Sequence, residues 1–271
     1  MNRRITAVFV ATVFFAACNG NNTQDIHNAN SASVVLPKEI TGLITAVHAN
    51  PDSNNIRLKL AFALDSIGMS QLALKQMDTL VVKDSTNYKL WLNRGSIAEN
   101  ARDTLQAMES YAKALHIYES PDALLSLANL YAETKNPRAL VICSRVKSLS
   151  LGKEYDAHSA FIAGVYYART GKQAEALQKF DECIGNNYTY MEAYIEKGMV
   201  YFDNKQFNEA LKVFQFAATV NNLYADAYYY QARCYEMMDK KDSAIQKFQQ
   251  SLGLDKSLKE AHEGLKRLGA E

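Results

Sequence analysis

Residues 192–211 read EAYIEKGMVYFDNKQFNEAL, and the same spacing of small and aromatic residues returns 34 residues later in DAYYYQARCYEMMDKKDSAI, residues 226–245. If Met191 is position 1 of a unit, the marked positions are 4, 8, 11, 20, 24 and 27. They hold Tyr194, Gly198, Tyr201, Ala210, Phe214 and Ala217. A fixed period of this length predicts stacked copies of one supersecondary unit.

The neighbouring units carry the same pattern. The next unit has Tyr228, Ala232, Tyr235, Ala244, Phe248 and Ser251, and the preceding one has Ala160, Gly164, Tyr167, Ala176, Phe180 and Cys183. Two more units begin at Asn54 and Tyr88. Large residues at positions 4, 11 and 24 are suited to fill the space between helices, and small residues at 8, 20 and 27 let helix axes approach closely.

The stretch from residue 121 to 156 fits the pattern less well. It keeps Leu124, Ala128 and Tyr131, but Ser144 stands where an aromatic residue is expected at position 24. Its distance to the next unit is two residues too long. Asn136 and Pro137 still predict the start of a second helix, because both residue types favour helix N-termini.

This pattern resembles the tetratricopeptide repeat, in which two antiparallel helices form each unit. The resemblance implies an all-α fold, a right-handed α-solenoid of six antiparallel helix pairs. The expected units are 54–87, 88–120, the degenerate 121–156, 157–190, 191–224 and 225–258. A solenoid needs polar outer faces at its ends. We therefore expect a lead-in helix within 37–53 and a capping helix over 259–271.

The first residues follow a different pattern. MNRR is a basic segment, the 13 residues ITAVFVATVFFAA are apolar but too few to cross a bilayer, and Cys18 follows two alanines. This resembles a bacterial lipoprotein signal over 1–17, which implies a lipid on Cys18. Phe15 departs from the leucine that this signal prefers, and the alternative is an ordinary secretory signal beside an incidental cysteine.

Residues 18–36 have low hydrophobicity and no periodicity, so we expect a flexible tether. Position 19 is Asn rather than Asp. By resemblance to lipoproteins of bacteria with two membranes, this residue implies an outer-membrane location. No acidic cluster follows it immediately, which favours the side that faces the periplasm over the cell surface. The membrane would then be a partner of the protein through its N-terminal lipid.

Charge and motifs narrow the function. The chain has a formal charge of +1, and removing residues 1–17 with Arg3 and Arg4 changes it to −1, so no basic stripe is left for a nucleic acid. No catalytic or nucleotide-binding motif is present, and the sequence predicts no enzyme, cofactor, metal site or small-molecule substrate. Cys143, Cys183 and Cys234 have no C-x-x-C spacing and are expected to be buried as small apolar residues.

The resemblance also implies a concave surface formed by the first helix of each unit. There the sequence places an apolar patch with charged residues at its rim, and such patches often bind partners. The candidate groove residues are Phe161, Val165, Arg169, Ile195, Met199, Phe202, Tyr229 and Arg233. The alternative is that these residues pack between repeats. The N-terminal units offer a sparser surface, on which we expect Glu99 to be replaceable by alanine without effect.

The sequence therefore predicts a lipid-anchored scaffold of the bacterial cell envelope that binds a protein or peptide in its concave groove. The alternative is an envelope lipoprotein that captures a glycan or a peptide. The lysine and asparagine clamp with which some tetratricopeptide proteins hold a terminal carboxylate is not expected. Position 5 has no lysine, and position 9 has asparagine only at Asn129.

Overall fold

The computed structural model describes residues 36–270, and these residues form fourteen α-helices and no strand. The helices are α1 (Lys38–Ala49), α2 (Asn54–Ser66), α3 (Ser70–Lys83), α4 (Tyr88–Asn100), α5 (Thr104–Ile117), α6 (Pro121–Glu133), α7 (Arg138–Ser148), α8 (Lys153–Arg169), α9 (Gln173–Asn186), α10 (Met191–Asp203), α11 (Phe207–Val220), α12 (Ala225–Met237), α13 (Lys241–Leu254) and α14 (Lys259–Arg267). The predicted signal segment and Cys18 lie outside the described residues. No helix within 36–270 is both long and apolar enough to cross a membrane.

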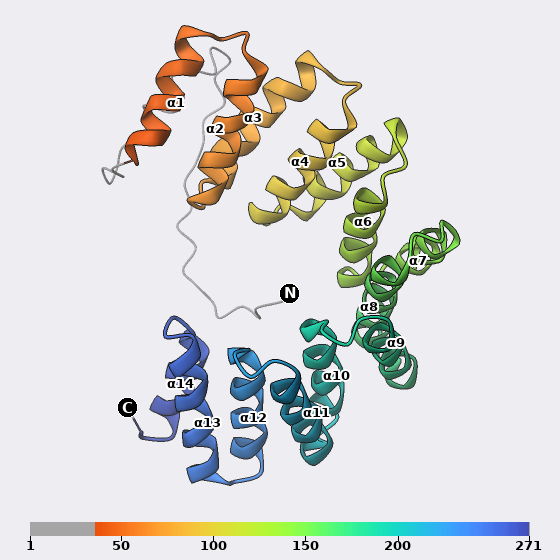
Figure 1. The fold of residues 1–271 in the computed structure, drawn as a ribbon, viewed down its shortest axis with the longest axis vertical. Helices are drawn as coiled ribbons and strands as arrows, with labels where there is room; N and C mark the ends of the chain where they lie inside the picture. The colour runs from red at the N-terminus through yellow and green to blue at the C-terminus, as the bar shows by residue number, and fades with distance from the viewer. Residues whose placement is uncertain (1–35, 271) are drawn as a thin grey trace.

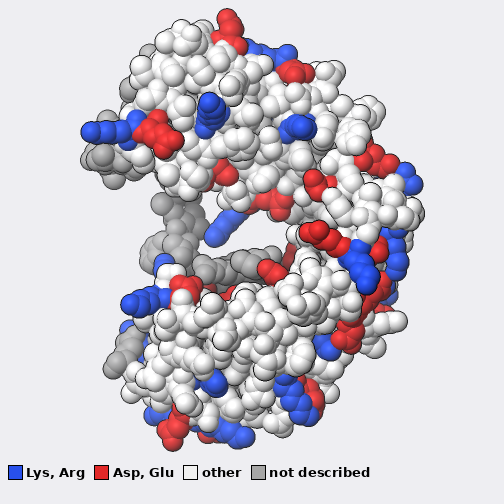
Figure 2. Space-filling model, viewed as in Figure 1, with Lys and Arg blue, Asp and Glu red and all other residues white. Residues whose placement is uncertain are grey.

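Helices α2 to α13 form six antiparallel pairs, and each pair packs against the next. Helix α1 covers the first pair and α14 covers the last. The pairs follow an open curve whose two ends, at α1 and at α13 and α14, face each other across a gap (Figure 1). The curve encloses a hollow (Figure 2). The predicted all-α solenoid of six helix pairs is confirmed.

One contact recurs at the centre of the pairs. The aromatic side chain at position 24 of the second helix lies directly on position 8 of the first helix. Tyr111, Phe180, Phe214 and Phe248 hold the aromatic position and are at most 2% exposed. A Cβ atom added to Gly164 would lie 2.6 Å from Cε1 of Phe180, and one added to Gly95 would lie 2.5 Å from Cε1 of Tyr111. Glycine is therefore needed there because the ring occupies the place of a side chain.

The turn inside each pair also repeats. Position 15 has a positive φ in all six pairs, at Gly68, Arg102, Lys135, Gly171, Lys205 and Asp239. The next residue donates its N–H to the carbonyl five residues back, as Gln206 does to Tyr201 at 3.0 Å. Many helices end in this way, with one residue in the left-handed conformation and this hydrogen bond from the residue after it. It turns the chain tightly enough for the second helix to return along the first.

The third pair departs from the regular spacing, and the structure corrects the prediction for its position 24. Ser144 is exposed, and the buried residue at the aromatic position is Cys143, with Ala139 and Val146 on the same face of α7. The buried residues of α7 come one position earlier in the unit than in the other pairs, although the link between α6 and α7, residues 134–137, has four residues and the other pairs have three. Cys143 is smaller than a ring, and α7 has only 11 residues.

The link between α7 and α8 has four residues, 149–152, as most links between pairs have, and the additional residues lie in an extra turn at the start of α8. Gly152 has a φ of 104°, and α8 begins at Lys153, four residues before Ala157, the first residue of the expected unit. Helix α8 therefore has 17 residues, whereas the other first helices of the pairs have 13. The two additional residues that the sequence shows in this region are thus used to lengthen the helix.

The three cysteines of the described region are buried and free. Burial raises the pKa of the thiols of Cys143, Cys183 and Cys234 to about 12 in each case. A thiol with such a pKa is almost fully protonated at neutral pH and reacts slowly. These residues act as small core side chains.

Replacing Gly164 by alanine tests the contact between ring and glycine. The new methyl group must displace Phe180, and we expect a loss of about 1–3 kcal/mol in the free energy of unfolding, as for other overpacked cores. In the last pair, position 8 is Ala232, which is buried in the same cluster as Phe248. A methyl group at position 8 is therefore compatible with the fold when the ring is positioned to leave room for it. Urea unfolding monitored by circular dichroism measures the loss.

The matched control is Gly185→Ala in the second helix of the same pair. A Cβ atom there meets nothing within 4 Å. Alanine is the better helix former, so stability should stay the same or rise by up to about 1 kcal/mol. Equal effects of the two substitutions would show that the ring does not require glycine.

Candidate functional site

The inner side of the curve is formed by the first helices of the pairs. Helix α6 contacts α8, α8 contacts α10, and α10 contacts α12. Figure 1 shows α6 on the inner side and α7 on the outer side of the curve. The inner surface is thus one continuous face that crosses several repeats, as the sequence predicts for a concave surface.

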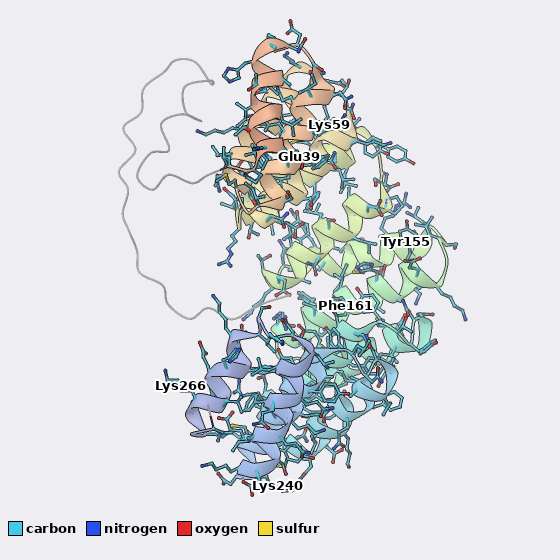
Figure 3. The ribbon with its side chains drawn as sticks, turned by 60° about the vertical axis from the view of Figure 1, so that its left-hand side comes forward. Glu39, Lys59, Tyr155, Phe161, Lys240 and Lys266 are labelled. Carbon is cyan, nitrogen blue, oxygen red and sulfur yellow. The ribbon has the colours of Figure 1, made fainter. Side chains whose placement is uncertain are left out.

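Two of the eight predicted groove residues have almost no surface. Val165 is 1% exposed and Tyr229 is 9% exposed, so both pack between helices. Phe161 is partly buried, with its ring centre 5.0 Å from that of Tyr190 and 6.0 Å from that of Phe180. Figure 3 shows Phe161 in the middle of the solenoid, between its two arms. The alternative that these residues fill space between repeats therefore holds for Val165 and Tyr229.

Ile195, Met199 and Phe202 lie together, and each is partly buried against a core formed by Ala210, Phe214 and Cys234. The Phe202 ring packs edge-on against the ring of Phe207, with the centres 5.2 Å apart. These side chains combine packing with some remaining surface. They form a half-buried apolar strip on the inner face instead of a fully exposed patch.

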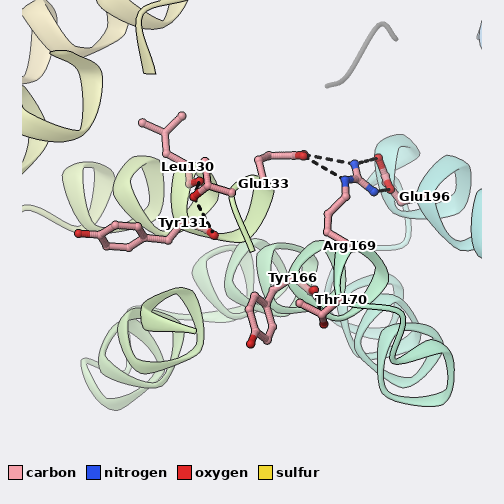
Figure 4. A network of polar contacts seen from close by, with 8 residues as sticks. Leu130, Tyr131, Glu133, Tyr166, Arg169, Thr170 and Glu196 are labelled. Carbon is pink, nitrogen blue, oxygen red and sulfur yellow. Dashed lines mark hydrogen bonds and ion pairs between the residues drawn. The ribbon is translucent and has the colours of Figure 1, made fainter. Parts of the chain in front are cut away.

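Arg169 joins three consecutive pairs through ion pairs (Figure 4). Its guanidinium donates to Glu133 of α6 at 3.0 and 3.2 Å and to Glu196 of α10 at 2.9 and 3.0 Å. Burial alone would lower the pKa of Arg169, and the hydrogen bonds and charges of Glu196 and Glu133 raise it instead. The guanidinium is occupied by these contacts, so Arg169 acts mainly as a link between repeats.

Arg233 has a similar role further along the curve. It donates to the hydroxyl of Tyr229 at 3.1 Å, pairs with Glu236 at 3.3 Å and lies over the ring of Phe202 at 5.7 Å. Glu236 also accepts two hydrogen bonds of 3.0 Å from Arg267 of α14. Both predicted groove arginines are thus held by contacts within the chain.

A cavity that the sequence did not predict lies on the inner face where α4, α6 and α8 meet. Its volume is about 410 Å³. We call it the acidic cavity, and it is lined by Glu99, Asp122, Leu125, Ser126, Asn129, Glu154, Tyr155, His158 and Ile162. Among the described residues, its lining has three carboxyl groups and no lysine or arginine. Acidic side chains are also visible along the inner rim of the curve (Figure 2).

Within the acidic cavity, Glu99 accepts a hydrogen bond from the hydroxyl of the buried Tyr111. Burial raises the pKa of Glu99, and the bond from Tyr111 opposes this rise. Replacing Glu99 by alanine would leave the buried Tyr111 hydroxyl without this acceptor, which typically costs about 1–3 kcal/mol. The expectation that this substitution has no effect is therefore wrong.

Burial also lowers the pKa of His158, against the opposing charges of Glu154, Glu192 and Asp122. The lowered pKa favours the neutral form of the imidazole, although the residue as a whole is exposed. Asp122 and Glu154 are exposed and stand in the first turns of α6 and α8. A negative charge there also stabilises the helix N-terminus.

The acidic cavity depends on the irregular third pair. Glu154 and Tyr155 belong to the extra first turn of α8, which the regular units lack. The two-residue excess in the sequence is the signal of this turn. Because these two residues do not fit the repeat pattern, the pattern alone does not predict the cavity.

Comparisons with known proteins agree with the geometry. Family models described as tetratricopeptide repeat match residues 88–120 and 195–258. These segments are tetratricopeptide repeats, and the whole described chain has the solenoid fold of such proteins. No curated protein matches the sequence.

Three solved structures show the extent of the structural likeness. A tetratricopeptide repeat protein from Parabacteroides merdae has a TM-score of 0.71 and 17% identity, over 85% of this chain and 91% of the other. The type IV pilus biogenesis factor PilW has a TM-score of 0.63 and 16% identity, over 78% and 98%. Cut9, in its hetero-tetramer with Hcn1, has a TM-score of 0.56 and 14% identity, over 85% and 46%. At these identities the likeness concerns the fold alone.

Substitution of Arg169 by glutamine tests the link between repeats. It removes the positive charge that lies between Glu133 and Glu196, although both carboxylates keep about a fifth of their surface. Because breaking a fully buried pair costs about 3–5 kcal/mol, we expect a loss of about 2 kcal/mol in the free energy of unfolding. Urea unfolding at pH 7 measures it.

Arg145→Gln is the matched control, since Arg145 donates two hydrogen bonds of 2.8 Å to Glu119 but both side chains are about half exposed. Exposed pairs contribute about 0.2–1 kcal/mol. If Arg145→Gln were as destabilising as Arg169→Gln, the burial of the Arg169 contacts would not explain their contribution.

Proposed function

We propose that the protein is a lipid-anchored scaffold of the bacterial cell envelope that binds a segment of a partner protein on the inner face of its solenoid. The observation that carries this proposal is the hollow on the inner side (Figure 2), where the first helices of consecutive repeats form one continuous surface. That surface combines the half-buried strip of Ile195, Met199 and Phe202 with the polar acidic cavity. Apolar contacts beside polar groups are typical of surfaces that bind proteins. Such a role involves no catalysis and no cofactor.

The proposed anchor rests on the sequence of residues 1–18: a basic segment, a short apolar run and a cysteine after two alanines. Residues 19–35 would then separate the lipid from the solenoid. An extended chain spans about 3.3–3.6 Å per residue, so this tether would let the inner face reach partners well away from the membrane surface. We propose the outer membrane as the location because residue 19 is Asn, and its periplasmic side because no acidic cluster follows immediately in the sequence.

Cys18→Ser tests the anchor. The variant should incorporate no labelled fatty acid and should leave the membrane fraction, because no other residue is proposed to carry lipid. Cys143→Ala is the control, since it removes a buried thiol and should keep the label. Label retained in Cys18→Ser, or lost in Cys143→Ala, would contradict lipidation at Cys18.

A photo-crosslinking amino acid placed along the solenoid tests the binding face. Inner positions are Asn129 in α6 and Met199 in α10; outer positions are Leu105 in α5 and Val141 in α7, which are 80% and 69% exposed. Irradiation of intact cells should give the same discrete partner adduct from both inner positions and none from the outer ones. An adduct formed only from the outer positions would place the binding surface on the convex side.

A further inference from the structure

We propose that the acidic cavity binds a lysine or arginine side chain of an extended partner segment, so that the partner is basic where it crosses α4, α6 and α8. This inference rests on the proposed function and specifies the chemistry of the partner. It follows from the charge of the cavity, its walls and its place on the inner face.

The charge of the acidic cavity is not compensated within the described residues. Elsewhere on the inner face, carboxylates are paired with arginine, as Glu133 and Glu196 are with Arg169. No ion pair with lysine or arginine involves Glu99, Asp122 or Glu154 in residues 36–270. Glu99 is half-buried, so less water screens its charge than on an open surface, whereas Asp122 and Glu154 are exposed.

The spacing of these groups favours an organic cation. Among the described residues, no three histidine, cysteine, aspartate or glutamate side chains are close enough to share a metal ion. The three carboxyl groups come from three different helices around a cavity of about 410 Å³. An ammonium or guanidinium group at the end of a long side chain can enter such a space and pair with one of the carboxylates at a time.

The walls suit the stem of such a side chain. Tyr155 supplies a partly exposed aromatic ring, whereas the apolar lining residues Leu125 and Ile162 are only 8% and 1% exposed. Lysine and arginine pack their methylene groups on apolar surface while the charged end meets polar groups, and both interact with aromatic rings. Ser126 and Asn129 add polar atoms beside the carboxylates.

The position of the cavity favours a polypeptide over a small amine. It opens on the inner face, and this face continues through α10 and α12 with the half-buried strip of Ile195, Met199 and Phe202. A main chain running along the inner face could insert one basic side chain into the acidic cavity and place apolar side chains on the strip. Tyr155, which lines the cavity, belongs to α8, the helix that also carries Phe161 (Figure 3).

Binding of labelled peptides to the full-length chain in detergent tests this inference. The probes are peptides of about twelve residues, long enough when extended to cross several helices. They share a glycine, serine and leucine background and carry lysine, glutamine or glutamate at every third position. Fluorescence anisotropy should show the lysine peptide binding at least about tenfold more tightly than the glutamine peptide, with an affinity that falls as salt is added. Equal affinity for the lysine and glutamine peptides would overturn the proposal.

The double variant Asp122→Asn with Glu154→Gln locates the binding. It removes two negative charges from the cavity and should weaken the lysine peptide by about tenfold. The control is Asp242→Asn with Glu175→Gln, which makes the same chemical change in exposed first turns of the outer helices α13 and α9. The control should retain affinity within about twofold. Equal weakening in both variants would show a general charge effect and overturn the site.

Two further readouts keep the outcomes separate. The melting temperatures of the two double variants should agree, because each loses the same pair of first-turn charges. If only the cavity variant fails to fold, peptide binding is measured on the single variant Asp122→Asn. Full displacement of the lysine peptide by an equal concentration of spermidine would assign the cavity to small amines and overturn the polypeptide assignment. If crosslinking at Asn129 and Met199 succeeds but the cavity variant leaves the adduct unchanged, this inference fails while the proposed function stands.

Discussion

The contact between an aromatic ring at position 24 and a small residue at position 8 is the constraint on which the solenoid depends. Each ring is enclosed completely, as with Phe180 over Gly164 and Phe214 over Gly198. Because the ring occupies the space of the missing side chain, it fixes both the separation of the paired helices and their rotation about their own axes. The same faces are then presented to the next pair, and the repetition of one local contact produces the curve and its hollow.

Two pairs lack the ring: the first has Met77 at position 24 and keeps the regular spacing, whereas the third has a different geometry. Cys143 replaces the ring, α7 is short, and the chain uses its additional residues for one more turn of α8. That turn brings Glu154 and Tyr155 to the inner face opposite Asp122 and Glu99. An irregularity that weakens the regular packing therefore creates the most distinctive surface of the protein, in the middle of the curve where a partner segment would cross.

Carboxylates on the inner face are of two kinds: some are paired with arginine within the chain, and others are available to a partner. Arg169 and Arg233 hold Glu133, Glu196 and Glu236 in contacts within the chain, so these charges contribute to cohesion between repeats. The carboxylates of the acidic cavity have no such counter-charge among the described residues. The half-buried strip near Met199 lies further along the same face. An inner face with a cation site followed by apolar surface would select partners by the order of their side chains.

The sequence by itself determined the all-α solenoid, the six helix pairs and the positions of the core rings, because these depend on short-range spacing that each unit repeats. It could not determine which inner-face residues stay accessible. Val165 and Tyr229 occupy inner positions by count but are buried, since exposure there depends on how closely neighbouring first helices approach. Only the tertiary structure showed that Arg169 is held by two other repeats and that three helices enclose the acidic cavity. Both features join residues from different repeats, and their geometry depends on the rotation between consecutive pairs, which no single unit encodes.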